Sequence, residues 1–244
     1  AYNRPRLNTE SLLLSHRYKH VGSLLGPLIP PQHSLPALSF FLSLGFGSVL
    51  HVSGSSGPRS YKVSRALPDD AECIEGWFRP GEEVAAKSYA SNVRAGNAVK
   101  VCKVGQATDF VPPGASPGPQ RGSDSGGGDA SPRPATIMGV CVFSFDSGLC
   151  TVRGVMARPG SATSEREGVF LLLLSCVTFR SLLDSSVAAV EMGEEAGDIR
   201  QVVEARGWKD TGRGRVGLVS GERVRFLVDV FAAHVGEEEE GGDG

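Results

Sequence analysis

The chain has 244 residues, 40% of them hydrophobic, and a formal net charge of −2, which suits one domain of ordinary size with extensions. This charge excludes both the broad basic field that attracts nucleic acid and a uniform acidic coat. The 32 glycines and 15 prolines are clustered, so we expect parts of the chain to lie outside the folded core.

Residues 1–58 form a basic, serine-rich and proline-rich segment with a single acid, Glu10. We predict an irregular N-terminal extension here. Its apolar run from Leu35 to Val52 is interrupted by proline and glycine and is shorter than the roughly 20 residues of a membrane-spanning helix. Three interpretations stay open: a disordered or wrongly assigned extension, a targeting segment, because an acid-poor basic start resembles a transit peptide, and a membrane-associated segment.

A folded domain is expected over residues 59–235. Its first part should contain two strands with two helices between them. Pro68 and the carboxylates that follow it favour a helix start at that point. The expected elements are a strand at Tyr61–Ala66, helices at Ala71–Phe78 and Glu82–Arg94, and a strand at Ala98–Val104.

Two segments have compositions that cannot bury enough apolar surface to offset the entropy of ordering them. The first, Phe110–Ala135, is rich in glycine and proline. Because it falls between two strands, we interpret residues 110–135 as a flexible insertion within one domain. The second, residues 236–244, contains four consecutive glutamates and is predicted to be a disordered acidic tail.

The second part of the domain begins with a predicted β-hairpin, whose turn is Asp146-Ser147-Gly148. A polar loop containing Arg166 and Gly168 should then lead into a long apolar helix. The expected elements are strands at Ile137–Phe145 and Leu149–Ala157, a helix at Val169–Leu183, a strand at Val187–Met192, a helix ending at Arg206-Gly207-Trp208, and a last strand at Arg223–Phe231.

This order of elements, from Tyr61 to Phe231, resembles that of the GNAT superfamily of N-acetyltransferases. Scattered residues carry the resemblance as well. They are Ile137-Met138-Gly139 at a strand start, Val155-Met156-Ala157-Arg158-Pro159 at a strand end, Arg166-Glu167-Gly168 before the long helix, and Glu204-Ala205-Arg206-Gly207-Trp208. The resemblance implies an α/β fold with a mixed, mostly antiparallel sheet flanked by helices.

The resemblance also implies an acyl-CoA-dependent N-acyltransferase. Acetyl-CoA would be the cosubstrate, and an unidentified amine would attack its thioester directly in a ternary complex. A helix N-terminus can hold the pyrophosphate, and glycine allows the backbone to approach it. The expected cofactor contacts are Val155, Met156, Ala157, Arg166, Glu167, Gly168 and Val169. Glu191, at the end of a strand near the expected cleft, is the candidate catalytic base.

Two alternatives remain at this point. One is a catalytically inactive binding or regulatory module on the same fold. It is suggested by Glu165 and Phe170 at positions where the family has Arg/Gln and Gly/Ala, and by Val203 where the family has a proton-donating tyrosine. The other is a different α/β enzyme, since Ala205–Trp208 also resembles the end of methyltransferase domains. That interpretation needs an early glycine-rich loop, and the hairpin argues against its mostly parallel sheet.

The five cysteines and five histidines do not form a recognisable metal motif. Four of the histidines precede residue 58, so a Cys–His nucleophile is not expected. Buried thiols are typical of a reducing compartment. We therefore expect a cytoplasmic protein without a metal, or a mitochondrial one if residues 1–58 are a presequence. We expect no nucleic-acid partner, and the sequence gives no firm evidence for a membrane.

Overall fold

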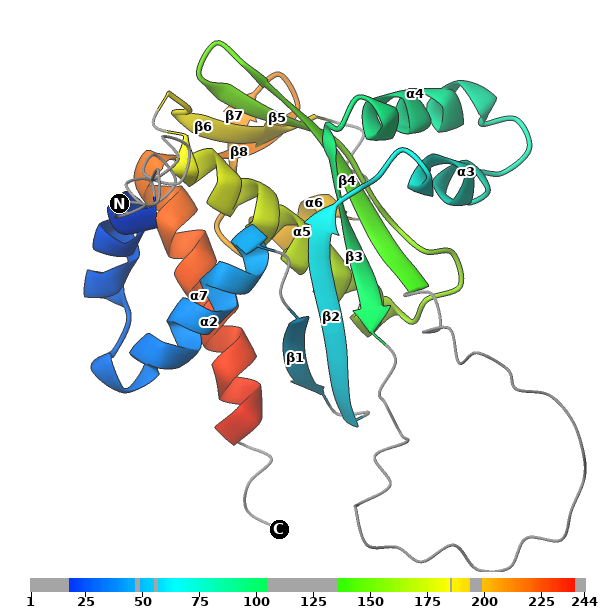
Figure 1. Cartoon of the computed structure of the whole chain (residues 1–244). Coiled ribbons are helices and arrows are strands. Elements are labelled where there is room, and N and C mark those ends of the chain that lie inside the picture. The colour runs from blue at the N-terminus through cyan, green and yellow to red at the C-terminus, as the bar shows by residue number, and fades with distance from the viewer. Residues whose placement is uncertain are drawn as a thin grey trace, which may run out of the picture.

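The structure is a computed structural model that describes residues 18–46, 49–54, 57–104, 136–184, 186–193 and 199–239. These residues form an open sheet of eight strands with helices on both faces (Figure 1). The predicted α/β fold, a mixed and mostly antiparallel sheet flanked by helices, is confirmed. The insertion predicted over residues 110–135 lies outside the described residues.

The sheet has the strand order β1-β2-β3-β4-β5-β6-β8-β7. Neighbouring strands are antiparallel except β5 and β6, which are parallel. The strands are β1 (Val49–Gly54), β2 (Gly57–Arg65), β3 (Ala98–Val104), β4 (Thr136–Asp146), β5 (Leu149–Ala157), β6 (Ala189–Met192), β7 (Lys209–Gly212) and β8 (Arg215–Val219).

The hairpin between β4 and β5 forms at the predicted turn. Ser147 and Gly148 have φ angles of 47° and 83°, and positive φ at both central residues gives the turn a twist that matches its flanking strands. Before the turn, successive side chains of β4 point to opposite faces of the sheet. Cys141 belongs to the larger hydrophobic cluster on one side, and Val142 belongs to the smaller cluster on the other.

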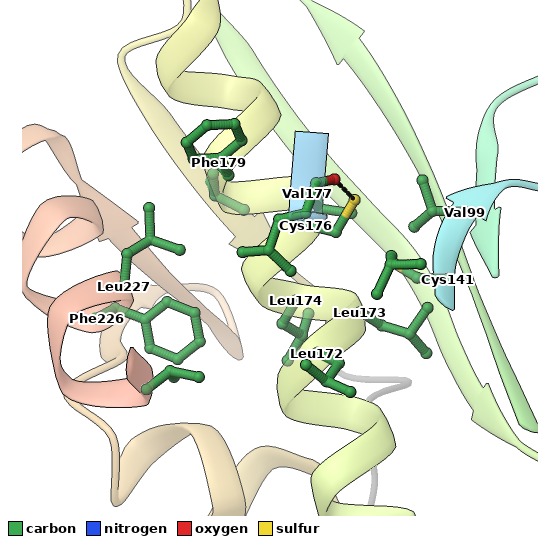
Figure 2. Packing of buried hydrophobic residues seen from close by; sticks show 14 of the residues in the cluster. Val99, Cys141, Leu172, Leu173, Leu174, Cys176, Val177, Phe179, Phe226 and Leu227 are labelled. Carbon is green, nitrogen blue, oxygen red and sulfur yellow. Dashed lines mark hydrogen bonds between the residues drawn. The ribbon is translucent and has the colours of Figure 1, made fainter. Parts of the chain in front are cut away.

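Helices cover the two faces unequally. The larger cluster packs α5 (Thr163–Leu183) against the strands on one side and against α7 (Ser220–Glu239) on the other, as Figure 2 shows for Leu173, Cys141 and Phe226. The smaller cluster lies under α3 and α4. The helices are α2 (Ser34–Phe46), α3 (Asp70–Glu75), α4 (Glu83–Arg94), α5 (Thr163–Leu183), α6 (Ile199–Glu204) and α7 (Ser220–Glu239), with short 3-10 turns η1 (Gly26–Leu28) and η2 (Pro31–His33).

Gly139 allows the central helix α5 to lie close to the sheet. A Cβ at this position would be 2.4 Å from Val169 Cγ1 and 3.0 Å from the carbonyl oxygen of Met156. The first distance is shorter than any ordinary Cβ contact and the second is tight, so a larger residue would force the Val169 side chain, and with it the packing of α5, to shift. The contact fixes the N-terminal half of α5 over β4, directly beside the end of β5.

The N-terminal region differs from the irregular extension predicted for residues 1–58. Residues 18–25 and α2 are helical, and α2 buries Ala37, Phe40, Phe41 and Leu44, which have helical spacing. The prolines suggested irregular structure, but they fall at helix starts, where the missing N–H of proline removes no hydrogen bond. Residues 1–17 lie outside the described part. None of the described helices is long and apolar enough to cross a membrane.

Aromatic contacts join this N-terminal region to the rest of the core. The Phe41 ring stacks on Phe179 of α5 with 6.0 Å between centroids, and Phe40 lies 5.7 Å from Phe231 of α7. The Cys176 thiol also donates a hydrogen bond to the Leu44 carbonyl oxygen at 3.3 Å. Residues 18–46 therefore form part of the hydrophobic core.

The C-terminal prediction of a strand over Arg223–Phe231 is wrong, because these residues lie in α7. The helix buries Val224, Leu227 and Phe231, a spacing that fits a helical period. β8, at Arg215–Val219, is the last strand of the chain and lies between β6 and the edge strand β7. The helix also continues to Glu239, into the segment predicted as an acidic tail, and residues 240–244 lie outside the described part.

The thiols are mostly sequestered, as the sequence suggests. Cys73 is exposed, whereas Cys102, Cys141, Cys150 and Cys176 are buried. Burial raises the pKa of the Cys150 thiol to about 12 and that of Cys141 well above its ordinary value. These two groups stay neutral at physiological pH and act as small hydrophobic side chains.

Candidate functional site

The candidate site is the place where β5 separates from β6. The two strands pair in parallel only from Leu149↔Ala189 to Val152↔Met192. Beyond Val152, β5 continues to Ala157 with β4 as its partner, and no described strand follows its other side. We call residues 153–157 of β5 the open edge.

A β-bulge bends β5 where the open edge begins. Val142 of β4 pairs with Gly154, but the next residue, Phe143, pairs with Val152, which leaves Arg153 as the extra residue. Bulges bend a strand and increase its twist. The bulge therefore explains why β5 leaves β6 at this point.

The open edge presents backbone groups that β4 does not use. The Arg158 N–H donates to the Met138 carbonyl oxygen at 2.7 Å, and Met156 pairs with Val140 two positions earlier. Because hydrogen-bonded and non-hydrogen-bonded pairs alternate in an antiparallel ladder, the N–H and C=O groups of Val155 and Ala157 face away from β4. Of the three β5 residues predicted to bind the cofactor, these two offer backbone groups to a ligand.

The loop of residues 158–162 connects the open edge directly to α5. This helix begins at Thr163, six residues before the predicted start at Val169, since the polar Thr-Ser-Glu sequence itself forms the first turn. Ala162 precedes the helix and cannot cap it with its side chain. The first amide groups of α5 therefore form an N-terminus that favours an anion.

The predicted phosphate-loop residues thus lie inside the helix. Gly168 is in its second turn, and a Cβ there would meet nothing within 4 Å, so close packing does not require this glycine. Gly160, with a φ of +81°, is the glycine that shapes the loop. The Pro159-Gly160 pair was a turn signal in the sequence that pointed to it.

The side chains of the first two turns of α5 have different surroundings. Val169 is buried against Gly139, and Glu167 is exposed. The half-buried guanidinium of Arg166 lies over the Phe170 ring, 5.9 Å from its centre. Arg166 is therefore a cation within two turns of the N-terminus of α5.

Glu165 is an acid in the first turn of the same helix, where it would repel a phosphate. Its carboxylate is instead held from the sheet side. Oε1 lies 3.3 Å from Arg59 Nη1 and 3.3 Å from Lys103 Nζ, and accepts a hydrogen bond from the Tyr61 hydroxyl at 3.3 Å. Burial raises the pKa of Tyr61, which keeps that hydroxyl a donor. Two cations thus compensate this acid in the first turn of α5.

Glu191 lies on β6 beside the point of separation, paired with Thr151 of β5 and Gly217 of β8. Its neighbours Val190 and Met192 are buried in the larger cluster, so Glu191 points to the α4 face. Its Oε2 atom is 3.5 Å from Arg215 Nη1, and the side chain is 20% exposed. The structure therefore leaves this carboxylate partly accessible on the side of the sheet that carries α4.

Tyr89 of α4 is a candidate residue that the sequence reasoning missed. A Cβ on Gly154 would lie 2.0 Å from the Tyr89 hydroxyl oxygen, so this hydroxyl sits directly on the backbone of the open edge. Gly154 pairs with Val142, a residue of the smaller cluster, which places Tyr89 and Glu191 on the same face. An isolated glycine within a strand was the one signal, because it often marks a close approach.

Among the residues that the structure describes, no group of three or more His, Cys, Asp or Glu side chains could hold a metal ion. No model of a known protein family matches the sequence, and no curated protein matches it. Distant similarities exist among solved structures.

A GNAT-family acetyltransferase from Bacillus cereus has 13% identity and a TM-score of 0.41, over 66% of this chain and 97% of its own. A GNAT-family acetyltransferase from Bacillus anthracis has 9% identity and a TM-score of 0.43, over 70% and 98%. A cAMP-binding acyltransferase from Mycobacterium smegmatis has 10% identity and a TM-score of 0.37, over 84% of this chain and 62% of its own. These values describe a distant similarity of layout.

Proposed function

We propose that the protein is an acyl-CoA-dependent N-acyltransferase that transfers an acetyl group from acetyl-CoA to an amine. The observation that carries this proposal is the open edge of β5, which leads through a five-residue loop to the uncapped N-terminus of α5. The pantetheine arm of CoA is extended and rich in amides and leads to phosphates, so it matches both the open edge and the N-terminus of α5.

Each part of the site has a role in binding. The backbone groups of Val155 and Ala157 would pair with the amides of the pantetheine arm, as an added strand pairs with a sheet edge. The amides of the first turn of α5 would hold the pyrophosphate, together with the side chain of Arg166. Compensation of Glu165 by Arg59 and Lys103 reduces the repulsion of that phosphate.

The transfer needs a neutral amine, a stabilised oxyanion and a proton for the departing thiolate. Glu191 would accept a proton from the attacking amine as the new N–C bond forms and the C–S bond breaks. The Tyr89 hydroxyl, placed on Gly154, would donate a proton to the thiolate. Tyr89 would thereby replace the proton-donating tyrosine that the GNAT family has at the position of Val203. Val203 itself is fully buried here.

Calorimetric titration of acetyl-CoA into the full chain tests the binding site. We expect saturable binding that weakens roughly tenfold in Arg166→Ala, because one charge-assisted contact to phosphate is lost. Arg225→Ala, which removes an exposed arginine from α7, should bind like the natural protein. If the folded chain does not bind acetyl-CoA at millimolar concentration, the proposal fails and an inactive module on this fold becomes the better description.

The chemical roles are tested with a panel of amines and mass spectrometry of the products. Tyr89→Phe and Glu191→Gln should each lower kcat by about 10² or more, while the Kd for acetyl-CoA stays within about twofold because neither side chain is assigned to the cofactor. Glu72→Gln, which makes the same change at an exposed position on α3, is the matched control and should leave kcat unchanged. An unchanged kcat in either variant would remove that residue from the mechanism.

A further inference from the structure

A cavity of about 150 Å³ lies between the N-terminal helices and the C-terminal half of α5. It is distinct from the candidate transfer site, since it reaches α5 at Phe179 and the open edge adjoins the start of that helix at Thr163. Residues 18–25, η1 and α2 supply the rest of its wall. The lining residues are Tyr18, Val21, Gly22, Leu25, Gly26, Ile29, Ser34, Ala37, Leu38, Phe41, Leu42 and Phe179.

The wall of this cavity is almost entirely apolar. Val21, Leu25, Phe41 and Phe179 are buried in the larger hydrophobic cluster, and burial raises the pKa of the Tyr18 hydroxyl, which keeps it uncharged. A volume of this size holds an apolar group of roughly six carbon atoms. The cavity is therefore suited to a hydrocarbon group and not to a polar metabolite.

Two glycines, Gly22 and Gly26, are part of the cavity wall. Both residues are exposed, and a Cβ added at Gly22 or at Gly26 would meet no atom within 4 Å, so a larger side chain fits at either position without a clash. Glycine is unfavourable within a helix relative to alanine. A larger side chain at either position would narrow the cavity, so these are the positions at which its use can be tested.

The surroundings of the cavity suit an amphiphile. The same segment leaves Leu24, Leu28, Leu35 and Leu38 exposed, with Leu35 at 79%. Residues 18–46 include Lys19, His20 and His33 and no carboxylate, so an anionic head group meets no repulsive side chain from this segment. We propose that the cavity binds the hydrocarbon chain of a fatty carboxylate, with the carboxylate at the surface.

Octanoate is a suitable probe, and its binding to the full chain can be measured by calorimetry. We expect one saturable site. Gly22→Leu, which fills the cavity, should weaken octanoate binding at least tenfold while the Tm stays the same or rises. Ser88→Leu, which adds the same side chain to an exposed position on α4, should leave binding unchanged.

Two further measurements make the test independent of one variant. Gly26→Leu should weaken octanoate binding in the same way, and it serves as the test if Gly22→Leu does not fold. Octanol, which has no charge, should bind several-fold more weakly than octanoate. The proposal is overturned if octanoate does not saturate, if a folded cavity-filling variant binds it as well as the natural protein, or if octanol binds as tightly.

Discussion

Phe179→Ala is expected to lower the free energy of unfolding by about 3–5 kcal/mol, the range for removing a buried aromatic side chain. Phe179 is only 1% exposed and sits where three segments meet. Its ring stacks on Phe41 of α2 and lies 5.9 Å from the Tyr18 ring. The substitution therefore removes packing inside α5 and the contact that holds the N-terminal helices.

Urea unfolding followed by circular dichroism measures this effect. Phe145→Ala is the matched control, because Phe145 is 46% exposed on β4 and its loss should cost about 1 kcal/mol or less. A similar, small effect at both positions would show that residues 18–46 do not pack on α5 in solution.

Arg223→Met is expected to destabilise the protein by about 3 kcal/mol. Arg223 is 4% exposed, and burial lowers the pKa of its guanidinium. Nη1 donates to the Ser181 carbonyl oxygen at 3.1 Å and to its hydroxyl at 3.1 Å, and Nη2 donates to the Val187 carbonyl oxygen at 2.9 Å. Methionine would leave these acceptors buried without a donor, at about 1–3 kcal/mol for each unsatisfied group.

The position of Arg223 also favours a cation, because it contacts the last turn of α5, where the helix dipole is negative. Arg225→Met provides the control on the exposed side of the same helix and should change stability by about 0.5 kcal/mol or less. Thermal unfolding of the two variants gives the comparison. Equal stabilities would mean that the hydrogen bonds of Arg223 are replaced by water.

The hairpin of β4 and β5 could be predicted from the sequence because its information is local. A turn at Ser147-Gly148 and strands of strongly apolar residues favour one structure. The segment Val224-Arg225-Phe226 was ambiguous, since its alternation suits a strand while Val224, Leu227 and Phe231 suit a helix. Packing against α5 favours the helix here. That contact is between segments distant in sequence, so a local pattern cannot predict it.

The candidate site was predictable in part for the same reason. Val155 and Ala157 followed from the end of a recognisable strand, and Glu191 from the end of another. Tyr89 could not be found in this way, because its approach to Gly154 joins α4 to a strand distant in sequence. The start of α5 at Thr163 was missed because Gly168 suggested a loop, although one glycine with free space around it is tolerated within a helix.

The packing of residues 18–46 has a practical consequence for shortened forms of the protein. A chain that begins at Gly57 would retain seven of the eight strands, yet it would uncover Phe179 and Phe231, which now contact Phe41 and Phe40. A newly exposed aromatic surface of this kind promotes self-association. Solubility trials and deletion studies should therefore keep the N-terminal helices, which shield the core from other copies of the chain.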